Sequence, residues 1–393
     1  MKTAFLNSIE KETYGGMEEW IRLVSAGLIE RGHSVTLMGR DNSQFLSRVG
    51  RSIPEVEAVS LNISGDFSPR TISRIRKYLS SLEIDTLCVN FNKDVRLGGI
   101  AARLNGRVNV VWSVGINIAR DKFSHRWLTP RLVDRIIVPS HSLKSEITSF
   151  GYLDPQLVEV IPIGISDVTF SYTGARAHQK LRDKYRLPGN AVVAVTVGRF
   201  VYKKGHEYLI DAVPAILDRF PDIYFLFLGD GPMERVLRKR IAALELADRF
   251  VFAGMLENID LELSGSDLMI HPSKEEPFGI ALLEGMRAGL PIVASDVGGI
   301  PEVVSDGETA VLCRPRSASA LADAIAKMLS DPVRMAAMGA GGRDRWKKNF
   351  RYDTMIDRVE NLFASEFNSR SRADQVVYNG NGKKRLHETA PGA

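Results

Sequence analysis

The sequence predicts an α/β protein made of two Rossmann-like domains, whose parallel sheets face each other across a cleft. The first observation is the length, because 393 residues are too many for one ordinary hydrophobic core. The second is the alternation of short, continuously apolar segments with longer segments of helical periodicity. Continuously apolar strands are typical of parallel sheets that helices cover on both faces. Their alternation with helices favours right-handed crossovers.

The expected strands fall into two groups, one before and one after a break in this pattern. The group in the first half lies at residues 3–9, 34–39, 86–91, 108–115 and 135–140, with a helix at 16–30 after the first strand. The group in the second half lies at residues 191–198, 224–231, 249–254, 268–273, 291–295 and 310–315. Each group therefore predicts one sheet and one domain.

The break between the two groups is a segment rich in Gly, Pro, Ser and Thr at residues 161–180, which we interpret as a linker. We expect an N-terminal domain at residues 1–165 and a C-terminal domain at 166–345. A C-terminal helix at 346–367 is expected to pack back on the first domain. Residues 368–393 have no periodic apolar face, which predicts disorder.

The composition limits the class of protein and its compartment. With 44% hydrophobic and 25% charged residues, the chain reads as a soluble globular protein. No eighteen apolar residues follow one another, and the N-terminus has no secretory signal pattern. Cys88 and Cys313 lie in apolar segments, which indicates buried free thiols in a reducing, cytoplasmic compartment. The net charge of +5 suits anionic substrates or an anionic membrane face, and we expect no nucleic-acid partner.

The most informative segment is "KEEPFGIALLEG", residues 274–285, directly after an apolar strand. We expect a strand, a loop and a helix, with Pro277 in the first turn of the helix and Gly289 near its end. The loop would lie at the C-terminal edge of the sheet, where open parallel sheets bind ligands. The free amides of Phe278, Gly279 and Ile280 could then hold an anion at the positive end of the helix dipole.

Glu276 and Glu284 add carboxylates to this anion site. They are eight residues apart, which corresponds to about 12 Å along a continuous helix. A ligand that touches both must be long, must carry hydroxyls at both ends and must carry negative charge between them. The alternative is that both glutamates solvate or cap a surface helix. That reading explains Glu276 well, but Glu284 less well, because it follows "ALL" on a helix expected to be buried.

A second cluster, "VGRFVYKKG", ends another expected strand of the second half. It contains Gly198 and Arg199 at the strand end and Lys204 five residues after the arginine. Two cations here could neutralise a diphosphate leaving group without a metal. Lys204 taken alone reads as a solvated loop charge, but the set beside the carboxylate loop favours an anion site.

A third cluster lies in the first half, where Gly15 and Gly16 separate the first strand from the first helix. A backbone without side chains can approach a phosphate closely at this place. A plain Gly-Gly turn is the alternative interpretation. The dinucleotide fingerprint G-x-G-x-x-G is absent from the segment, which disfavours a nicotinamide oxidoreductase.

With these three clusters the chain resembles the retaining glycosyltransferases of family 4, which have the two-domain GT-B fold. The resemblance covers roughly residues 10–350. Its strongest motifs are "VGRFVYKKG", "FLGDGP", "FVFAG" and "HPSKEEPFGIALLEGMRAGLPIVASDVGGIPEVVSDGETAVL". The family's pattern of two glutamates separated by seven residues matches Glu276 and Glu284, and not Glu275.

The resemblance implies a role for each matched residue. Glu276 would contact hydroxyls of the donor sugar, and Glu284 would contact the ribose of the nucleotide. Arg199 and Lys204 would hold the diphosphate, at the strand end marked by Gly198.

Further contacts to the donor are implied by the same resemblance. The amides of residues 278–280 would lie beside the diphosphate. Gly15 and Gly16 would complete the phosphate site when the cleft closes, and the loop around Met255 and Leu256 would lie near the base.

The reaction implied by the resemblance is transfer of a hexosyl group with the anomeric configuration of the donor retained. The commonly argued route is front-face return, in which the leaving phosphate takes the proton of the acceptor. No D-x-D pair stands at a plausible strand end. Because a pair of cations can stabilise the departing diphosphate, we expect neither a cofactor nor an obligatory metal. Closure of the cleft would exclude water.

One departure from the family concerns the acceptor side of the first domain. Many relatives carry a histidine near the end of the fourth or fifth strand, but residues 110–122 contain none. Ser113 or Asn117 could supply a neutral hydrogen bond in its place. His125 is not assigned to this role on proximity alone, and His271 is expected to pack under its strand end.

The acceptor is expected to be a glycan or a glycolipid. Arg70, Arg74 and Lys77 recur at helical spacing, and Trp127 follows Arg126. A solvated helix face explains these cations, and docking on an anionic membrane leaflet or on a phosphorylated glycolipid is the alternative. We expect a peripheral enzyme at the inner face of the membrane, acting in lipopolysaccharide or polysaccharide biosynthesis. A sugar-nucleotide epimerase and a non-catalytic nucleotide-sugar-binding protein on the same fold are the competing interpretations.

Overall fold

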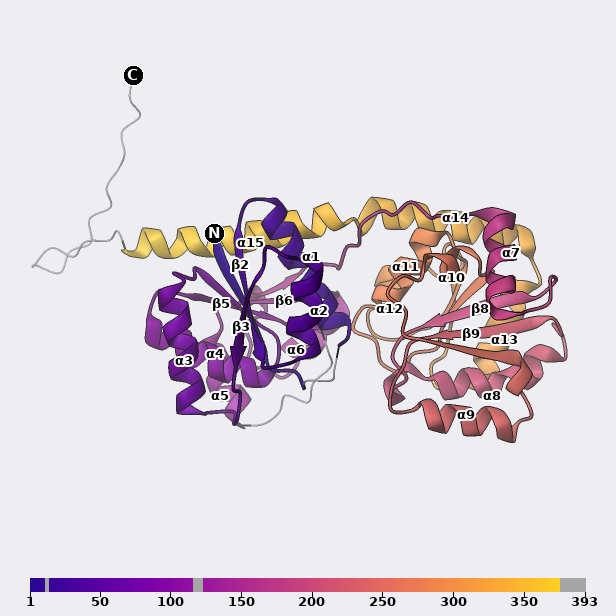
Figure 1. The fold of residues 1–393 in the computed structure, drawn as a ribbon, viewed down its shortest axis with the longest axis horizontal. Helices are drawn as coiled ribbons and strands as arrows, with labels where there is room; N and C mark the ends of the chain where they lie inside the picture. The colour runs from indigo at the N-terminus through magenta and orange to yellow at the C-terminus, as the bar shows by residue number, and fades with distance from the viewer. Residues whose placement is uncertain (11–13, 116–122, 375–393) are drawn as a thin grey trace, which may run out of the picture.

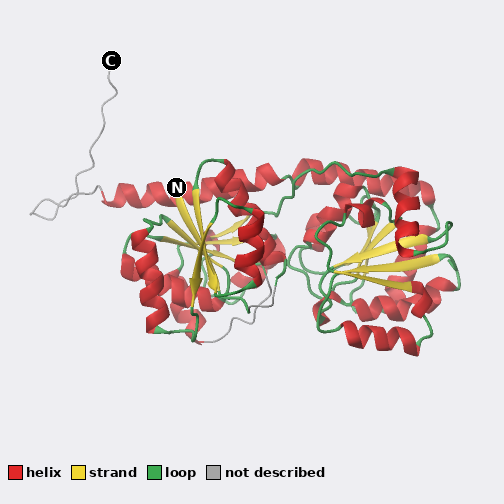
Figure 2. Cartoon of the chain, in the orientation of Figure 1, coloured by secondary structure: helices red, strands yellow, loops and turns green. Residues whose placement is uncertain are grey.

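The computed structural model describes residues 1–10, 14–115 and 123–374. In these residues, two parallel sheets lie side by side, each with helices on both faces (Figures 1 and 2). This is the predicted fold of two Rossmann-like halves. The strands are buried because their continuous apolar segments are covered from both sides, as β4 (Thr86–Val89) and β5 (Asn109–Ser113) illustrate.

The first sheet has seven strands in the order β3-β2-β1-β4-β5-β6-β7. Besides β4 and β5, these are β1 (Lys2–Asn7), β2 (Ser34–Arg40), β3 (Glu57–Leu61), β6 (Arg135–Val138) and β7 (Val158–Val160). The helices around this sheet are α1 (Gly16–Glu30), α2 (Gln44–Ser52), α3 (Pro69–Ser81), α4 (Asn92–Asn105), α5 (Phe123–Leu132) and α6 (His141–Thr148). A short 3₁₀ turn at Pro155–Leu157 precedes the last strand.

The second sheet has six strands in the order β10-β9-β8-β11-β12-β13. They are β8 (Val192–Val197), β9 (Ile223–Leu228), β10 (Phe250–Gly254), β11 (Leu268–His271), β12 (Ile292–Ser295) and β13 (Ala310–Cys313). The helices are α7 (Gly174–Tyr185), α8 (His206–Leu217), α9 (Glu234–Ala243), α10 (Asp260–Ser264), α11 (Ile280–Ala288), α12 (Ile300–Val303), α13 (Ala318–Leu329) and α14 (Pro332–Asn349). Two 3₁₀ turns lie at Tyr202–Lys204 and Ala247–Arg249.

All six strands expected in the second half are present, but the sequence analysis missed β3 and β7 in the first. Both lie at the edges of the sheet. β3 exposes alternate side chains to solvent, and β7 has only three residues. Neither therefore carries the continuous apolar run on which the prediction depended.

The chain crosses between the two sheets twice. The first crossing begins after β7, and α7 starts at Gly174, so the second part of the expected linker 161–180 is helical. The second crossing follows α14, at Phe350 and Arg351. The crossings are hydrogen-bonded to each other, because the amide of Ile165 donates to the carbonyl of Phe350 at 3.1 Å.

The C-terminal helix α15 (Tyr352–Asp374) runs along the first half of the molecule (Figure 1). It packs so closely on α1 that a Cβ added at Gly27 would lie 2.6 Å from Ile356. The expected helix at 346–367 therefore starts later than predicted, because α14 continues through Asn349, and it ends later, at Asp374. Residues 368–374 are helical, and the rest of the tail expected to be disordered lies outside the described residues.

Two further expectations concern buried cysteine thiols and membrane-spanning helices. Cys88 and Cys313 are buried free thiols, as the sequence indicated. No helix in the described ranges is both long and apolar enough to cross a membrane.

Candidate functional site

The residues singled out in the sequence meet at the C-terminal edge of the second sheet, where it faces the first. The loop that follows β11 carries Glu276, and the loop that follows β8 carries Arg199. β8 and β11 are neighbours in the sheet, so both loops leave it at the same edge. In open parallel sheets this edge is the usual place for a ligand.

The helix of the carboxylate loop begins later than predicted. α11 starts at Ile280, and Gly279 precedes it with a φ of 104°, a conformation that favours glycine. Pro277 therefore lies in the loop and not in the first helical turn, which corrects the prediction. The loop is held by the amide of Gly299, which donates to the carbonyl of Glu276 at 2.9 Å. Glu276 and Glu284 consequently do not share one continuous helix.

The N-terminus of α11 presents free hydrogen-bond donors. Among the described residues, the amides of Phe278, Gly279 and Ile280 donate to no acceptor. The side chain of Phe278 is buried and packs edge-on against Phe350, with ring centroids 5.9 Å apart, which anchors the loop. A helix start with free amides and a positive dipole end can bind an anion.

Glu276 is buried within a cluster of polar groups. Its Oε2 atom lies 2.5 Å from Nζ of Lys204, 2.8 Å from Nε2 of His271 and 3.1 Å from Oγ of Ser273. Burial by itself would raise the pKa of Glu276, but the Lys204 ammonium and the His271 ring hold the pKa well below its ordinary value. The carboxylate is therefore charged before any ligand arrives.

His271 and Ser273 are parts of the site that the sequence analysis did not assign. His271 is only 2% exposed, and burial lowers the pKa of its ring against the opposing effect of Glu276, which favours the neutral imidazole. A neutral ring can contact the carboxylate only as an Nε2–H donor. The expectation that His271 packs under the strand end understated this contact. Its position at the end of β11, five residues before Glu276, was the available signal.

Arg199 is half-buried, and its guanidinium forms no hydrogen bond or ion pair in the described part of the chain, although its charge acts on the carboxylate of Glu18. It follows Gly198, whose φ is 151°. A Cβ added at Gly198 would lie at an ordinary contact distance of 3.8 Å from Cε of Lys204, so the positive φ, and not lack of space, favours glycine here. Lys204 is 26% exposed and has three N–H donors, one of which is directed at Glu276.

The glycine turn of the first half lies next to these groups of the second half. A Cβ added at Gly15 would lie 3.8 Å from Cδ of Arg199, and one added at Gly16 would lie 3.4 Å from Cδ1 of Ile280. The first turn of α1 and the first turn of α11 therefore converge on the same space. Two segments of the second half contribute cations and free amides to it, and the glycine turn of the first half lies against both.

Glu18 orders the glycine turn and was missed by the sequence analysis. It is 1% exposed and accepts a hydrogen bond from the amide of Gly15 at 2.9 Å and another from Nδ2 of Asn7 at 2.9 Å. Burial raises the pKa of Glu18, and these hydrogen bonds and Arg199 oppose the rise. Its signal in the sequence is an acidic residue in the first turn of a helix that begins with glycines.

Glu284 lies in a different electrostatic environment, on α11. It is partly buried, and burial raises its pKa to about 7. Arg287 opposes this rise, whereas Glu19 of the first half and Asp260 add to it. Glu19 also bonds Tyr14 Oη at 3.1 Å. Glu284 therefore faces other carboxylates and has no cation as close as Lys204 is to Glu276.

Met255 and Leu256 lie in the loop after β10. Met255 is 41% exposed, and Nη1 of Arg48 on α2 lies 3.2 Å from its sulfur atom. The guanidinium of Arg48 also lies over the ring of Tyr14, 5.1 Å from its centroid. This loop is thus in contact with the first half of the molecule.

The acceptor-side residues proposed from the sequence are less informative. Ser113 is 4% exposed, and its hydroxyl is directed at Sδ of Met17, 4.0 Å away, which places it beneath α1. Asn117 lies outside the described residues. His125 is 7% exposed, and its Nε2 atom lies 3.4 Å from Nη1 of Arg96.

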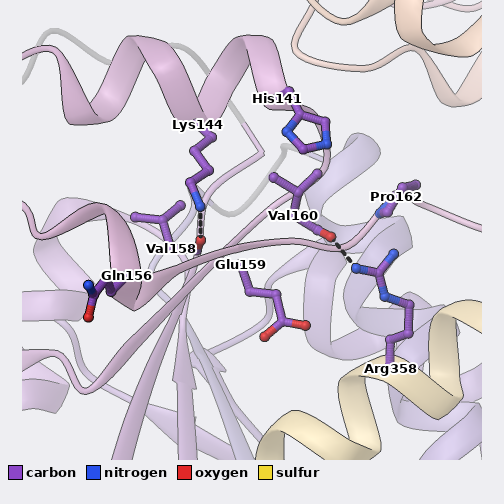
Figure 3. A pocket seen from close by; sticks show the side chains of 8 residues that line it. All are labelled: His141, Lys144, Gln156, Val158, Glu159, Val160, Pro162 and Arg358. Carbon is purple, nitrogen blue, oxygen red and sulfur yellow. Dashed lines mark hydrogen bonds between the residues drawn. The ribbon is translucent and has the colours of Figure 1, made fainter.

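A cavity of about 330 Å³ lies away from this site, against the edge strand β7 (Figure 3). Nζ of Lys144 donates to the carbonyl of Val158 at 2.7 Å, and Nη2 of Arg358 donates to that of Val160 at 2.5 Å. None of the site residues described above lines it. Elsewhere, the structure brings together no three His, Cys, Asp or Glu side chains that could hold a metal within the ranges it describes.

Comparison with known families gives matches in both halves of the chain. Residues 177–346 match the family model described as Glycosyl transferases group 1. Residues 14–168 match the model described as Glycosyltransferase Family 4. Together the two matches span most of the chain.

Among curated proteins, a similar one is the GDP-mannose-dependent alpha-(1-6)-phosphatidylinositol monomannoside mannosyltransferase of Mycobacterium tuberculosis. It is 28% identical over 316 residues, which cover 76% of this chain and 80% of that protein. The alpha-D-kanosaminyltransferase of Streptomyces kanamyceticus is 37% identical over 155 residues, or 39% of this chain and 40% of that protein.

Solved structures show the same fold. HepE of Anabaena, crystallised with UDP and glucose, superposes with a TM-score of 0.81 at 23% identity, covering 93% of this chain and 100% of that one. WaaG, described as a glycosyltransferase involved in lipopolysaccharide biosynthesis, superposes with a TM-score of 0.71 at 14% identity, covering 92% and 99%.

Proposed function

Because this chain belongs to glycosyltransferase family 4, with the GT-B fold and a nucleotide-sugar donor, we propose that it is a retaining, metal-independent transferase acting on a glycolipid or glycan intermediate. The observation that carries the proposal is the convergence of Arg199, the free amides at the start of α11, and the Gly15–Gly16 turn beside the charged carboxylate of Glu276. A diphosphate joined to a sugar matches this arrangement of donors and acceptor.

The diphosphate of the donor would bind to the cations and the free amides. Arg199 can offer a bidentate pair of N–H groups, and Lys204 has N–H donors beyond the one directed at Glu276. The amides of residues 278–280 and the dipole of α11 add to the positive electrostatic potential at the diphosphate. Negative charge grows on the diphosphate as the sugar departs, so these donors stabilise the transition state more than the bound donor.

The sugar would be oriented by Glu276. As a buried carboxylate it can accept hydrogen bonds from sugar hydroxyls, and Lys204, His271 and Ser273 hold it in place. Lys204, His271 and Ser273 all contact Oε2, and no described residue donates a hydrogen bond to Oε1. Oε1 therefore remains available to the sugar.

The nucleoside would extend along α11. Glu284 would bind the ribose hydroxyls, and the loop of Met255 and Leu256 would lie near the base. This assignment is supported by the exposure of Met255 and by its contact with Arg48 of the first half.

In the reaction we propose, the bond between the anomeric carbon and the β-phosphate oxygen breaks. The acceptor hydroxyl forms its bond to the same face of the sugar, and its proton passes to the departing phosphate oxygen. The protein supplies positioning and positive charge, and closure of the two domains excludes water.

The absence of a metal requirement can be tested with EDTA. We expect full activity in EDTA, and dependence of the activity on added Mg²⁺ or Mn²⁺ would overturn the proposal that the transferase is metal-independent.

The acceptor we propose is a lipid-linked or polysaccharide intermediate, such as one of lipopolysaccharide biosynthesis. The curated relative from Mycobacterium tuberculosis is named for a phosphatidylinositol mannoside, which supports a glycolipid.

We further propose that the first domain contacts an anionic membrane leaflet. Phe123 and Trp127 on α5 are 81% and 52% exposed, and Arg131 lies over the Trp127 ring at 4.7 Å. The exposed cations of α3 are Arg70, Arg74, Arg76 and Lys77. Sedimentation with phosphatidylglycerol vesicles, lost on Trp127→Ala or with phosphatidylcholine alone, would support this contact. Equal sedimentation with both lipids, or with neither, would refute it.

A panel of nucleoside diphosphate sugars tests the donor assignment. A ligand at about a hundred times its dissociation constant stabilises the folded chain by roughly 2.7 kcal/mol, so the right donor should raise Tm clearly. Slow hydrolysis of that donor, lost in Glu276→Ala, would support a transferase. Binding without hydrolysis would favour a non-catalytic binding protein, and an epimer of the donor seen by NMR would favour an epimerase.

A further inference from the structure

Three hydrogen bonds join the start of α6 in the first domain to the second domain. The hydroxyl of Ser140 donates to the carbonyl of Pro277 at 2.7 Å. The amides of His141 and Ser142 donate to the two carboxylate oxygens of Glu302, at 2.8 Å and 2.7 Å. On the first domain the contact consists of two backbone amides and one serine hydroxyl, and on the second it consists of a backbone carbonyl and the Glu302 carboxylate, both of whose oxygens are bonded.

The contact is electrostatically favourable for α6. The first amides of a helix have no partner within it, and its N-terminus carries the positive end of the dipole. Ser140 caps the helix, because its hydroxyl accepts a hydrogen bond from the amide of Leu143 at 3.1 Å. Glu302 supplies the second cap from the other domain, as a charge-assisted pair of hydrogen bonds. The start of α6 is thus completed only when the domains meet.

On the side of the second domain, Glu302 is rigidly connected to the Glu276 loop. Besides the bond from Gly299 to Glu276, a Cβ added at Gly298 would lie 2.1 Å from the carbonyl oxygen of Glu276. One added at Gly299 would lie 2.2 Å from that of Pro277. The two glycines therefore allow α12 to pack directly on the loop.

On the side of the first domain, α6 is attached to its sheet. Lys144 of α6 bonds the carbonyl of Val158 on β7, and Arg358 of α15 bonds that of Val160 (Figure 3). The start of α6 cannot move without the sheet behind it. A displacement of α6 relative to Glu302 is consequently a displacement of one domain relative to the other.

We propose that Ser140 and Glu302 are positioning residues for the transfer reaction. They hold the Glu276–Pro277 loop at a set distance from the first domain, and so align Arg199 and the start of α11 with the Gly15–Gly16 turn. The first domain thus orients the donor-binding loop through hydrogen bonds that themselves touch no substrate. This inference rests on the proposed function, because it assigns the loop to the donor.

The test compares Glu302→Ala and Ser140→Ala with two matched controls in the full-length protein. Glu308→Ala removes an exposed glutamate of the same domain. Ser43→Ala removes a buried serine that caps α2 through the amide of Leu46 at 3.3 Å, with no bond to the second domain. Both Ser43→Ala and Ser140→Ala remove a helix cap. Only Ser140→Ala also removes a hydrogen bond to Pro277, so the difference between the two variants reports that bond.

We expect Glu302→Ala and Ser140→Ala each to lower kcat/KM for the donor roughly tenfold or more, the scale of a misplaced reacting group. Glu302→Gln keeps one acceptor oxygen, so its kcat/KM should lie between those of Glu302→Ala and wild type. Small-angle scattering without donor should give a larger radius of gyration for Glu302→Ala than for wild type. Both controls should keep wild-type kcat/KM and scattering, even where Ser43→Ala lowers Tm.

Equal losses of kcat/KM in Ser140→Ala and Ser43→Ala would overturn the inference, as would wild-type kcat/KM and scattering in Glu302→Ala. Its failure is distinguishable from failure of the proposed function. If the wild-type protein turns over no nucleotide sugar, the proposed function fails, and the scattering comparison alone decides whether Glu302 sets the domain arrangement.

Discussion

Glu276 lies in the loop before α11, and Glu284 lies eight positions later on that helix. The two carboxylates nevertheless occupy opposite electrostatic environments. Glu276 contacts an ammonium group, an imidazole N–H and a hydroxyl. Burial would raise its pKa, but Lys204 and His271 hold the pKa below the ordinary value. Burial raises the pKa of Glu284 to about 7, and the nearby carboxylates of Glu19 and Asp260 add to the rise. Glu276 is thus charged in advance, whereas Glu284 becomes easier to ionise only when something donates hydrogen bonds to it.

The difference suits the two ends of a nucleotide sugar. The sugar end needs an acceptor whose position and charge are set before the reaction, since any rearrangement there adds to the barrier. The ribose end needs affinity, which a pair of hydroxyl donors can supply to a carboxylate that lacks them. The following experiments would break or sharpen this comparison.

Lys204→Ala is expected to have the largest effect, because it removes the main cation that neutralises Glu276. Leaving a buried charge unpaired costs about 3 kcal/mol of stability, and losing one donor to the diphosphate lowers turnover about a hundredfold or more. Thermal unfolding and donor turnover would measure the two losses.

Lys203→Ala is the matched control for that substitution. Lys203 pairs with Glu275 at 2.9 Å, and both side chains are largely exposed. Exposed pairs contribute about 0–1 kcal/mol, so stability and turnover should stay near wild type. If Lys203→Ala and Lys204→Ala were equally impaired, the special environment assigned to Glu276 would be wrong.

Glu284→Gln is expected to stabilise the unliganded protein at pH 8. Below about pH 4.5 the carboxyl is protonated in both the folded and the unfolded chain; above about pH 7 it is ionised in both, and the folded chain bears the cost of the buried charge. The stability lost by wild type between these pH values is about 2 kcal/mol in order of magnitude. Denaturant unfolding of both proteins at pH 5 and pH 8 should show that Glu284→Gln raises the free energy of unfolding at pH 8 by several times as much as it does at pH 5.

Donor affinity should rise with pH as Glu284 ionises. If the ribose hydroxyls donate to this carboxylate, the wild-type protein should bind the donor several-fold more tightly at pH 8 than at pH 6, roughly the effect of one hydrogen bond to a charged group. Calorimetric titration of Glu284→Gln should show a nearly flat profile over the same range. A flat profile in wild type would mean that Glu284 does not contact the ribose as an anion.

Glu19→Gln is expected to have the smallest effect on the site, although it also weakens the ion pair of Glu19 with Arg22 at 2.6 Å. Removing one nearby negative charge lowers the pKa of Glu284, so the midpoint of the pH profile of donor affinity should move to lower pH by a few tenths of a unit, as expected for a partly solvated neighbour. Tm should change little. A shift of the midpoint to higher pH would contradict the placement of Glu19 beside Glu284.

Much of the fold could be predicted because it depends on local pattern. Buried parallel strands require continuous apolar segments, and every strand of the second sheet has one. β3 and β7 were missed because they are edge strands of the first sheet. An edge strand has a neighbouring strand on one side only and can expose some of its side chains, as β3 does, so it needs no continuous apolar segment. The start of α11 was misplaced for a different reason: the carbonyls of Glu276 and Pro277 bond Gly299 and Ser140, residues that no local pattern brings to this loop.

The sequence by itself determined the two parallel sheets, the glycine turn between the first strand and the first helix, and the chemical types of the residues at the strand ends. Only the tertiary structure decided that Lys204 neutralises Glu276 across 72 positions and that Glu19 faces Glu284. The reason is physical. Strand and helix formation follow from the order of apolar and polar residues along the chain, whereas the ionisation of a buried carboxylate depends on which distant charges and hydrogen-bond donors the fold places within a few ångströms.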